Sequence, residues 1–152
     1  MKTIGNILWH VPFCGFVSAF LVYGFGVLLT ATVIAAPIGL GCMEFGKFLM
    51  APFGNTMINR KDIDRPKNSL WSTYSNVVTA VYLPFGILLA GLSALQAALL
   101  AVTIVGIPLA IIVAKSLGTY LNPVNKKCVS IAVANEIEQR KAKEKVDHML
   151  SK

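Results

Sequence analysis

Charged residues are scarce in this chain, and two long stretches have none at all. Only 14% of the 152 residues are Asp, Glu, Lys or Arg, whereas a globular domain usually has about a quarter. No such residue lies between Lys2 and Glu44, and none lies between Lys67 and Lys115. About 20 apolar residues cross a bilayer as a helix. Each stretch is about twice that length, which argues against a soluble domain and predicts an integral membrane protein.

The chain also lacks the patterns of a secreted, catalytic or metal-binding protein. The first apolar stretch is far longer than the core of a signal peptide. Cys14, Cys42 and Cys128 are neither paired nor spaced like metal ligands, so we expect small buried apolar side chains. His10 and His148 fit interfacial and solvated side chains better than ligands. We therefore predict no catalytic residue, no metal site and no cofactor, and no enzyme.

A sparse pattern recurs along the chain at an offset of 71 residues. It consists of one threonine and two prolines in each copy, namely Thr32, Pro37 and Pro52, then Thr103, Pro108 and Pro123. Because prolines are few here and have a distinct backbone role, their recurrence indicates two copies of one membrane unit. Pro37 and Pro108 are interpreted as kinks inside a membrane helix.

The expected fold is an all-α integral membrane protein of two tandem hairpin repeats. Turns are predicted at residues 24–26 and 93–96, so that about four apolar helices result and the second of each pair carries the kink. The predicted units are a first hairpin at 1–54, a charged cytoplasmic loop at 55–73, a second hairpin at 74–125 and a cytoplasmic tail at 126–152.

The basic residues predict the orientation. They gather at Lys2, in residues 60–67 and in the tail from Lys126, while both predicted turns are uncharged. Positive loops stay cytoplasmic, which gives four spans, both termini inside, and parallel repeats related by an axis along the membrane normal. The rival arrangement has one span and a re-entrant or surface segment after each proline. The tendency of positive loops to stay cytoplasmic also explains the net charge of +7. The predicted partner is therefore the lipid bilayer, and no nucleic acid is needed to explain the charge.

The tail is predicted to be a solvated helix. A helix that lies on anionic lipid, or that pairs with its copy in an oligomer, remains an alternative. Residues 129–133 have the composition of a short strand instead.

Two ion pairs are possible for the first charged residue after the repeated prolines Pro37 and Pro108. Glu44 and Lys115 are equivalent at the offset of 71 and have opposite signs, so they form a candidate cross-repeat pair at the cytoplasmic mouth. The local alternative joins Glu44 to Lys47, three residues along the same helix.

A family resemblance rests on a spaced set of residues that comprises Asn6, Trp9, Pro37, Cys42, Glu44, Lys47, Pro52, Phe53 and Gly54, with Gly106-Ile107-Pro108 and Leu121-Asn122-Pro123 in the second copy. This pattern resembles the YccF-domain family of small bacterial inner-membrane proteins, over most of the chain up to about Lys127. The second copy departs from it at Val124-Asn125 and Leu121-Asn122, where the family tends to have an aromatic-Gly pair and a Trp. The resemblance implies an inner-membrane location and a duplicated unit, and it implies no activity.

Two classes of function follow, and the sequence favours the first, a channel or transport-related unit. A homo-oligomeric channel or transport unit would be lined by the weakly polar side chains Thr30, Thr32, Ser93, Gln96 and Thr103. In the competing interpretation these hydroxyls bond back to their own helices, and the chain is a structural or accessory subunit that packs against a larger membrane partner. Small residues at a spacing of four are predicted to contact another helix, and they are Ala90, Ala94, Ala98, Ala110, Ala114 and Gly118.

Overall fold

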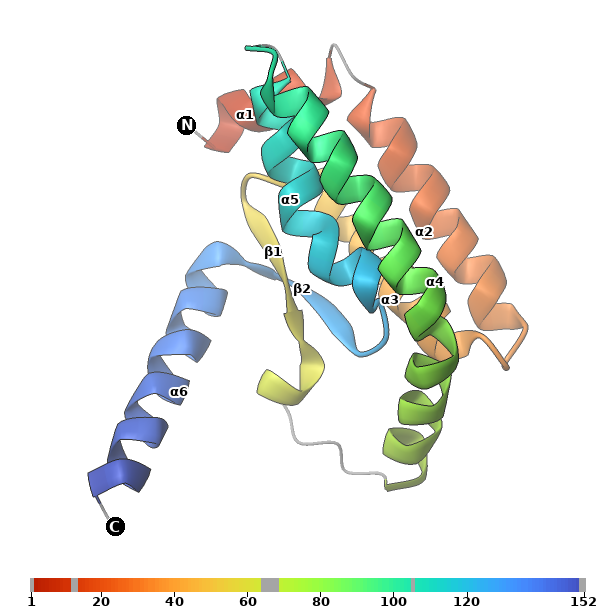
Figure 1. Cartoon of the computed structure of the whole chain (residues 1–152), viewed down its shortest axis with the longest axis vertical. Coiled ribbons are helices and arrows are strands. Elements are labelled where there is room, and N and C mark those ends of the chain that lie inside the picture. The colour runs from red at the N-terminus through yellow and green to blue at the C-terminus, as the bar shows by residue number, and fades with distance from the viewer. Residues whose placement is uncertain (1, 12–13, 64–68, 105, 151–152) are drawn as a thin grey trace.

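The computed structural model describes residues 2–11, 14–63, 69–104 and 106–150, and it is mostly helical. The helices are α1 (Lys2–His10), α2 (Gly15–Ala31), α3 (Ala36–Met50), α4 (Ser69–Ala101), α5 (Ile107–Leu121) and α6 (Ile131–Leu150). Two strands, β1 (Asn55–Asn59) and β2 (Lys126–Ser130), and the short 3₁₀ helix η1 (Arg60–Asp62) complete the described elements (Figure 1).

Two helical hairpins are present, but their turns are not where the sequence predicted them. Helix α2 continues through residues 24–26 and helix α4 through residues 93–96. The turns lie instead after Ala31 and after Ala101. Gly26 serves close packing and not a turn, because a Cβ there would lie only 2.7 Å from the backbone nitrogen of Met43 in α3.

The prolines begin helices and do not kink them, which corrects the prediction for Pro37 and Pro108. Each lies within the first two positions of its helix, α3 or α5. A first-turn proline removes an N–H that has no partner inside the helix, so it is tolerated there. Pro52 and Pro123 follow the ends of the same two helices.

The threonines of the repeat organise the two turns in the same way. Thr32 Oγ1 donates to the Leu29 carbonyl at 2.7 Å, and Thr103 Oγ1 donates to the Leu100 carbonyl at 3.0 Å. Each hydroxyl also accepts a backbone N–H three residues further on. The turns are therefore built alike, as the repeat predicts.

The repeat extends to whole elements. Helices α3 and α5, and strands β1 and β2, have the same lengths and begin 71 residues apart. The strands pair antiparallel with Met57 opposite Cys128, and these two residues are themselves equivalent at that offset. A local two-fold axis that relates the copies therefore passes between Met57 and Cys128.

The ribbon formed by β1 and β2 is the part of the fold that the all-α prediction missed. Each strand has only five residues and pairs with a segment far along the chain. Such a short two-stranded ribbon is not stable alone and depends on packing against helices. Local sequence therefore gives little sign of it. The predicted charged loop at 55–73 contains β1, η1 and the start of α4, and residues 64–68 lie outside the described part.

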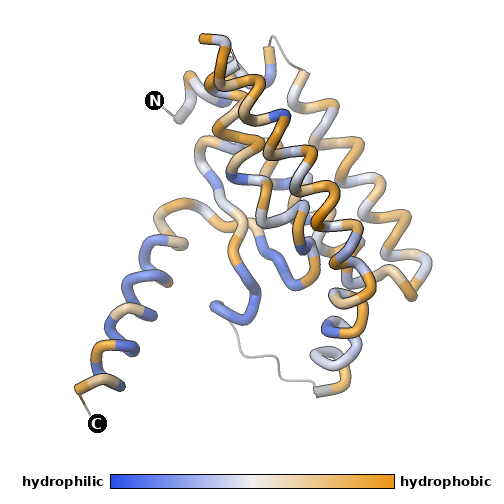
Figure 2. Tube along the Cα trace, viewed as in Figure 1, coloured by the Kyte–Doolittle hydropathy of each residue, from blue (hydrophilic) through white to orange (hydrophobic). Residues whose placement is uncertain are grey.

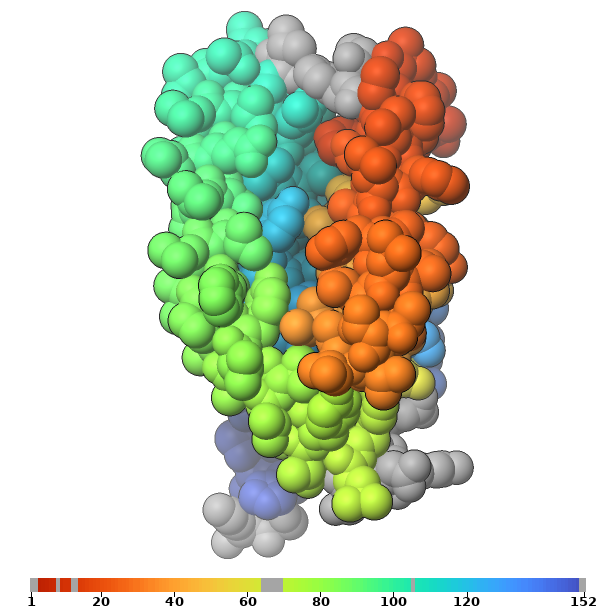
Figure 3. Space-filling model, turned by 90° about the vertical axis from the view of Figure 1, so that its right-hand side faces the viewer, coloured from red at the N-terminus to blue at the C-terminus, as the bar shows by residue number. Residues whose placement is uncertain are grey.

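The elements form three layers along the two-fold axis. Helices α2 and α4 form an outer layer, α3 and α5 lie behind them, and the ribbon with α6 lies on the far side (Figure 1). Seen from the outer layer, α2 and α4 stand apart, with parts of α3 and α5 recessed between them (Figure 3). Hydrophobic residues follow the apolar helices, while hydrophilic residues gather on the ribbon and α6 (Figure 2). One face of the protein is therefore apolar and the opposite face is polar.

The core lies where the two hairpins meet the ribbon. Its buried side chains are Ala19, Phe45, Phe48, Leu49 and Ile112. The Phe45 ring meets the Tyr120 ring edge-on at 5.4 Å between centroids, which joins α3 to α5. The tail is helical, as predicted, and α6 is almost entirely exposed. The strand alternative for residues 129–133 holds only up to Ser130, where β2 ends.

Candidate functional site

Helix α1 is bound to the end of α3. Trp9 Nε1 donates to the Leu49 carbonyl at 2.8 Å, and His10 Nε2 donates to the Met50 carbonyl at the same distance. Asn6 Oδ1 accepts the backbone N–H of Phe53 at 3.2 Å. The last carbonyls of a helix have no partner inside it. Side chains from α1 therefore complete the end of α3 and hold the chain as it turns toward β1.

Glu44 connects α3 to the second repeat. Its Oε1 lies 2.5 Å from Lys47 Nζ, and its Oε2 accepts the backbone N–H of Cys128 in β2 at 2.9 Å. Lys115 Nζ instead donates to the Pro52 carbonyl at 3.3 Å. Of the two ion pairs left open by the sequence, the structure has the local pair and not the cross-repeat pair. Glu44 and Lys115 each reach the other repeat, but the partner is backbone.

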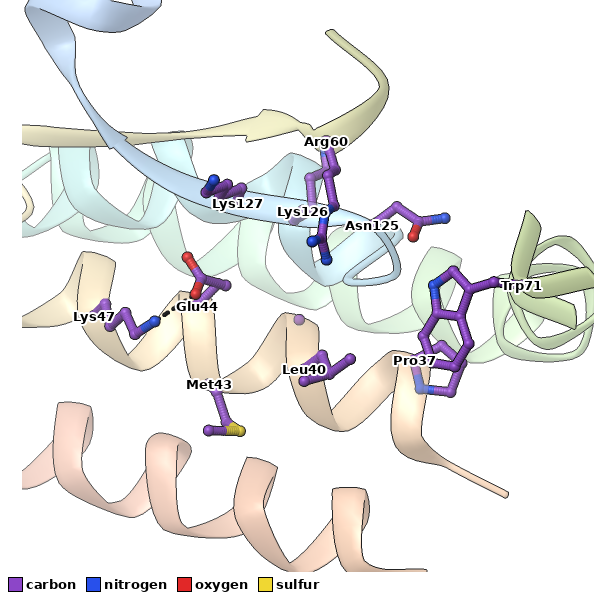
Figure 4. A pocket seen from close by; sticks show the side chains of 11 residues that line it. Pro37, Leu40, Met43, Glu44, Lys47, Arg60, Trp71, Asn125, Lys126 and Lys127 are labelled. Carbon is purple, nitrogen blue, oxygen red and sulfur yellow. Dashed lines mark hydrogen bonds and ion pairs between the residues drawn. The ribbon is translucent and has the colours of Figure 1, made fainter. Parts of the chain in front are cut away.

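A cavity of about 220 Å³ adjoins Glu44, between α3, the start of α4 and the turn into β2 (Figure 4). Its polar lining comprises Glu44, Lys47, Arg60, Asn125, Lys126 and Lys127, and its apolar lining includes Pro37, Leu40, Met43 and Trp71. Four side chains are cationic and one is anionic, so the lining has an excess of positive charge. Sequence reasoning did not find this pocket, because its residues come from segments far apart in the chain.

Burial affects Lys126, one of the cations of this pocket. Desolvation lowers the pKa of Lys126, and the nearby Asp62 carboxylate partly opposes that effect. Asp62 itself pairs with Lys141 of α6 at 2.6 Å. Within the described residues, neither Arg60 nor Lys126 forms an ion pair. These two positive charges are therefore available to an anion.

The polar side chains considered for a pore are not gathered in one place. Thr30 Oγ1 donates to the Gly26 carbonyl at 2.8 Å, and Thr32 and Thr103 bond to their own helices as described. The turn that follows Thr32 and the turn that follows Thr103 lie at opposite ends of the bundle (Figure 1). Ser93 is half-buried and Gln96 is exposed along α4.

The small residues predicted to contact a helix are mostly open in the single chain. Ala110 is buried and Ala90 is half-buried, whereas the exposed members are Ala94, Ala98, Ala114 and Gly118. Contact of those four with another molecule stays a prediction. Close helix approach inside the chain uses other glycines, such as Gly86, where a Cβ would lie 2.2 Å from the Leu121 carbonyl oxygen. In the described part of the chain, no three His, Cys, Asp or Glu residues are arranged to hold a metal ion.

The reactivity of the Cys128 thiol should report on the contact between Glu44 of α3 and Cys128 of β2. Burial, together with the negative charge of Glu44, raises the pKa of Cys128 to about 11. The raised pKa leaves little thiolate at pH 8, so alkylation should be on the order of a hundredfold slower than in the denatured chain, and faster as the pH rises. Glu44→Gln leaves the burial, which is the larger cause, and removes the negative charge that also raises the pKa of Cys128, so it should make alkylation moderately faster. The measurement uses a chain with Cys14→Ser and Cys42→Ser, and equal rates for folded and denatured protein would contradict the buried position.

Comparison with known proteins assigns the first repeat. Residues 4–55, about one third of the chain, match the family model of YccF, described as an inner membrane component domain. This segment covers most of α1 and all of α2 and α3, including the junction around Trp9 and Glu44. The match ends at Asn55, so it does not extend to the second copy as the resemblance had implied. No curated protein and no solved structure matches the chain. Residues 4–55 of the chain are therefore similar to the YccF inner membrane component domain.

Proposed function

We propose that the protein is a structural component of the inner membrane whose two hairpins enter one leaflet, while the ribbon and α6 stay at the cytoplasmic surface. The observation that carries this proposal is the division of the surface along the two-fold axis, with the apolar α2 and α4 on one side and the ribbon and α6 on the other (Figures 1 and 2). The axis would then run along the membrane normal.

The helix lengths support this arrangement over an upright bundle, in which the helices would cross the whole bilayer along its normal. Helix α2 has 17 residues, and α3 and α5 have 15 each. At 1.5 Å per residue they reach about 22–26 Å, short of the roughly 30 Å hydrocarbon core. Within the described residues, one helix, Leu70–Ala101, is long and apolar enough to span. At about 48 Å it would need a tilt beyond the usual range of about 0–40° to match the core.

The ribbon supports the same orientation. Each of its two strands has one edge without a strand partner, and unpaired backbone groups are not tolerated in lipid hydrocarbon. The ribbon also carries Lys126 and Lys127, and it continues into the charged α6. In an upright bundle the ribbon would lie at the same depth as the apolar helices, whereas in the leaflet arrangement it lies at the aqueous surface.

The hairpin tips have the character of buried membrane segments. Val33 and Ile34 at the first tip are 73% and 80% exposed, and Val102 and Ile104 at the second are 83% and 88% exposed. At the first tip, Tyr74 Oη donates to the Ile34 carbonyl at 2.6 Å, so this backbone group has a partner within the protein. Exposed apolar side chains at both tips suit hydrocarbon better than water.

The orientation of the protein in the membrane and the class of its function follow from these features. The positive-inside rule directs the polar face, with both termini, toward the cytoplasm. The threonine hydroxyls bond within their own helices, which favours a structural or accessory role over a channel and over an enzyme. The exposed Ala94 and Ala114 leave room for a second copy or a larger membrane partner.

Cysteine labelling with a membrane-impermeant maleimide tests the arrangement. Single cysteines at Val33, Leu95 and Ile104, on a cysteine-free background, should stay unlabelled from both sides of the membrane and react after detergent is added. The matched control Lys143→Cys on α6 should react from the cytoplasmic side.

Labelling of Leu95→Cys from the periplasmic side would instead support the four-span arrangement, in which that residue lies in an external turn. The same purified protein in liposomes should give no ion flux above protein-free vesicles. Reproducible ion flux would contradict the structural role and support a channel instead.

A further inference from the structure

We propose that the pocket beside Glu44 binds the phosphate group of an anionic phospholipid headgroup. The proposal rests on the leaflet arrangement, which brings the pocket to the level where headgroups lie. The pocket combines a cavity of about 220 Å³ with cationic side chains from several elements.

The cations come from two directions. Arg60 follows β1, and Lys126 begins β2, so the paired strands bring them to the same end of the ribbon (Figure 4). Lys127 is the next residue, and Lys47 faces the pocket from α3 beside Glu44. Because Lys47 already neutralises Glu44, the charges left for a ligand are those of Arg60, Lys126 and Lys127. Arginine and lysine together are well suited to a phosphate group.

Part of the lining is apolar. Leu40 and Pro37 of α3 contribute to it together with Trp71 of α4, whose indole lies beside Pro37 in Figure 4, whereas the Met43 side chain points away from the cations, toward Thr30 of α2. Tryptophan favours the membrane interface, where one edge of the ring meets water and the other meets lipid. A free anion would gain no favourable contact from these apolar side chains, whereas the glycerol and upper acyl carbons of a lipid would lie against them.

The volume fits this ligand. About 220 Å³ is the space of roughly seven water molecules in the liquid, enough for a phosphate and part of a glycerol and too small for a whole lipid. The acyl chains would therefore remain outside, along the apolar helices.

The positive charge of the pocket has no equivalent at the positions related by the repeat. The equivalents of Lys126 and Lys127 are Asn55 and Thr56, and the equivalent of Arg60 is Ile131. Duplication alone therefore does not account for the cluster, because its three cations have no charged equivalents in the repeat.

Lipid titration tests the site directly. The full chain, purified in a neutral detergent, is titrated with dioctanoyl phosphatidylglycerol, dioctanoyl phosphatidylcholine and glycerol 3-phosphate, and binding is followed by calorimetry. We expect saturable binding of the phosphatidylglycerol, at least tenfold weaker binding of glycerol 3-phosphate, and none of the phosphatidylcholine. The double variant Arg60→Gln, Lys126→Gln should lose at least tenfold in affinity.

The matched control removes the same charge elsewhere, with Lys143→Gln and Lys145→Gln on α6, and should bind as the parent does. Lys127→Glu provides a second pocket variant if the double variant does not fold, and it should weaken binding as well. Equal loss in the pocket and α6 variants would overturn the site, and equal affinity for glycerol 3-phosphate would replace the lipid by a free anion. The maleimide pattern of the pocket variants should match the parent, so a failed lipid site leaves the leaflet arrangement standing, and a failed labelling pattern is seen independently of lipid binding.

Discussion

Replacing Gly41 by alanine is expected to destabilise the protein by about 3 kcal/mol or more. A Cβ at Gly41 would lie 2.0 Å from the carbonyl oxygen of Pro123 and 2.7 Å from its carbonyl carbon. Both obstacles are backbone, and Pro123 is buried just before β2. The two segments would have to separate by roughly 1 Å or more, and over-packing of this kind costs about 1–3 kcal/mol even where flexible side chains can move.

Gly91→Ala is the matched control, because no atom would lie within 4 Å of its added Cβ. Alanine in a helix interior is favoured over glycine, so this variant should be unchanged or stabilised by about 0.5–1 kcal/mol. Thermal unfolding in detergent measures both. A Gly41→Ala protein as stable as the Gly91→Ala protein would show that α3 and the turn before β2 are not in close contact.

Trp9→Ala is expected to cost about 3 kcal/mol, at the low end for loss of a large aromatic side chain because Trp9 is only half-buried. The indole packs on the core and donates to the Leu49 carbonyl. Trp9→Phe keeps much of the ring and loses the donor, so about 1–2 kcal/mol should be lost.

The other tryptophan provides the comparison. Trp71 is 38% exposed and lines the pocket, so Trp71→Ala should change the unfolding free energy in detergent by less than about 1 kcal/mol. If the two alanine variants melt together, α1 does not hold the end of α3, and the role assigned to Trp9 is wrong.

The repeat was visible in the sequence because it depends on residues with a fixed backbone role. Thr32 and Thr103 close the turns, and Pro37 and Pro108 begin the helices that follow, so the offset of 71 carried over to the structure. The predicted turn positions were wrong because glycine occurs both in turns and where two helices pack closely. Gly24 and Gly26 resemble a turn in sequence, yet Gly26 permits the close approach of α3.

The ribbon and the pocket could not be predicted for a different reason. Both depend on pairing between residues 55–59 and 126–130, and a five-residue strand gives no local sign of its distant partner. Once the register is known, Arg60 and Lys126 fall side by side, and the cation cluster follows. Glu44 was recognised as significant from its position, but its backbone partner, Cys128, again depends on that register.

The depth of the hairpin tips tests the leaflet arrangement most directly. A bimane fluorophore attached at Val33→Cys or Ile104→Cys is compared with one at Ser130→Cys, in vesicles whose lipids carry bromine at different acyl positions. We expect strong quenching of both tips from the same leaflet and little quenching at Ser130, which ends β2. Quenching of the two tips from opposite leaflets, or aqueous quenching of either tip, would contradict the arrangement.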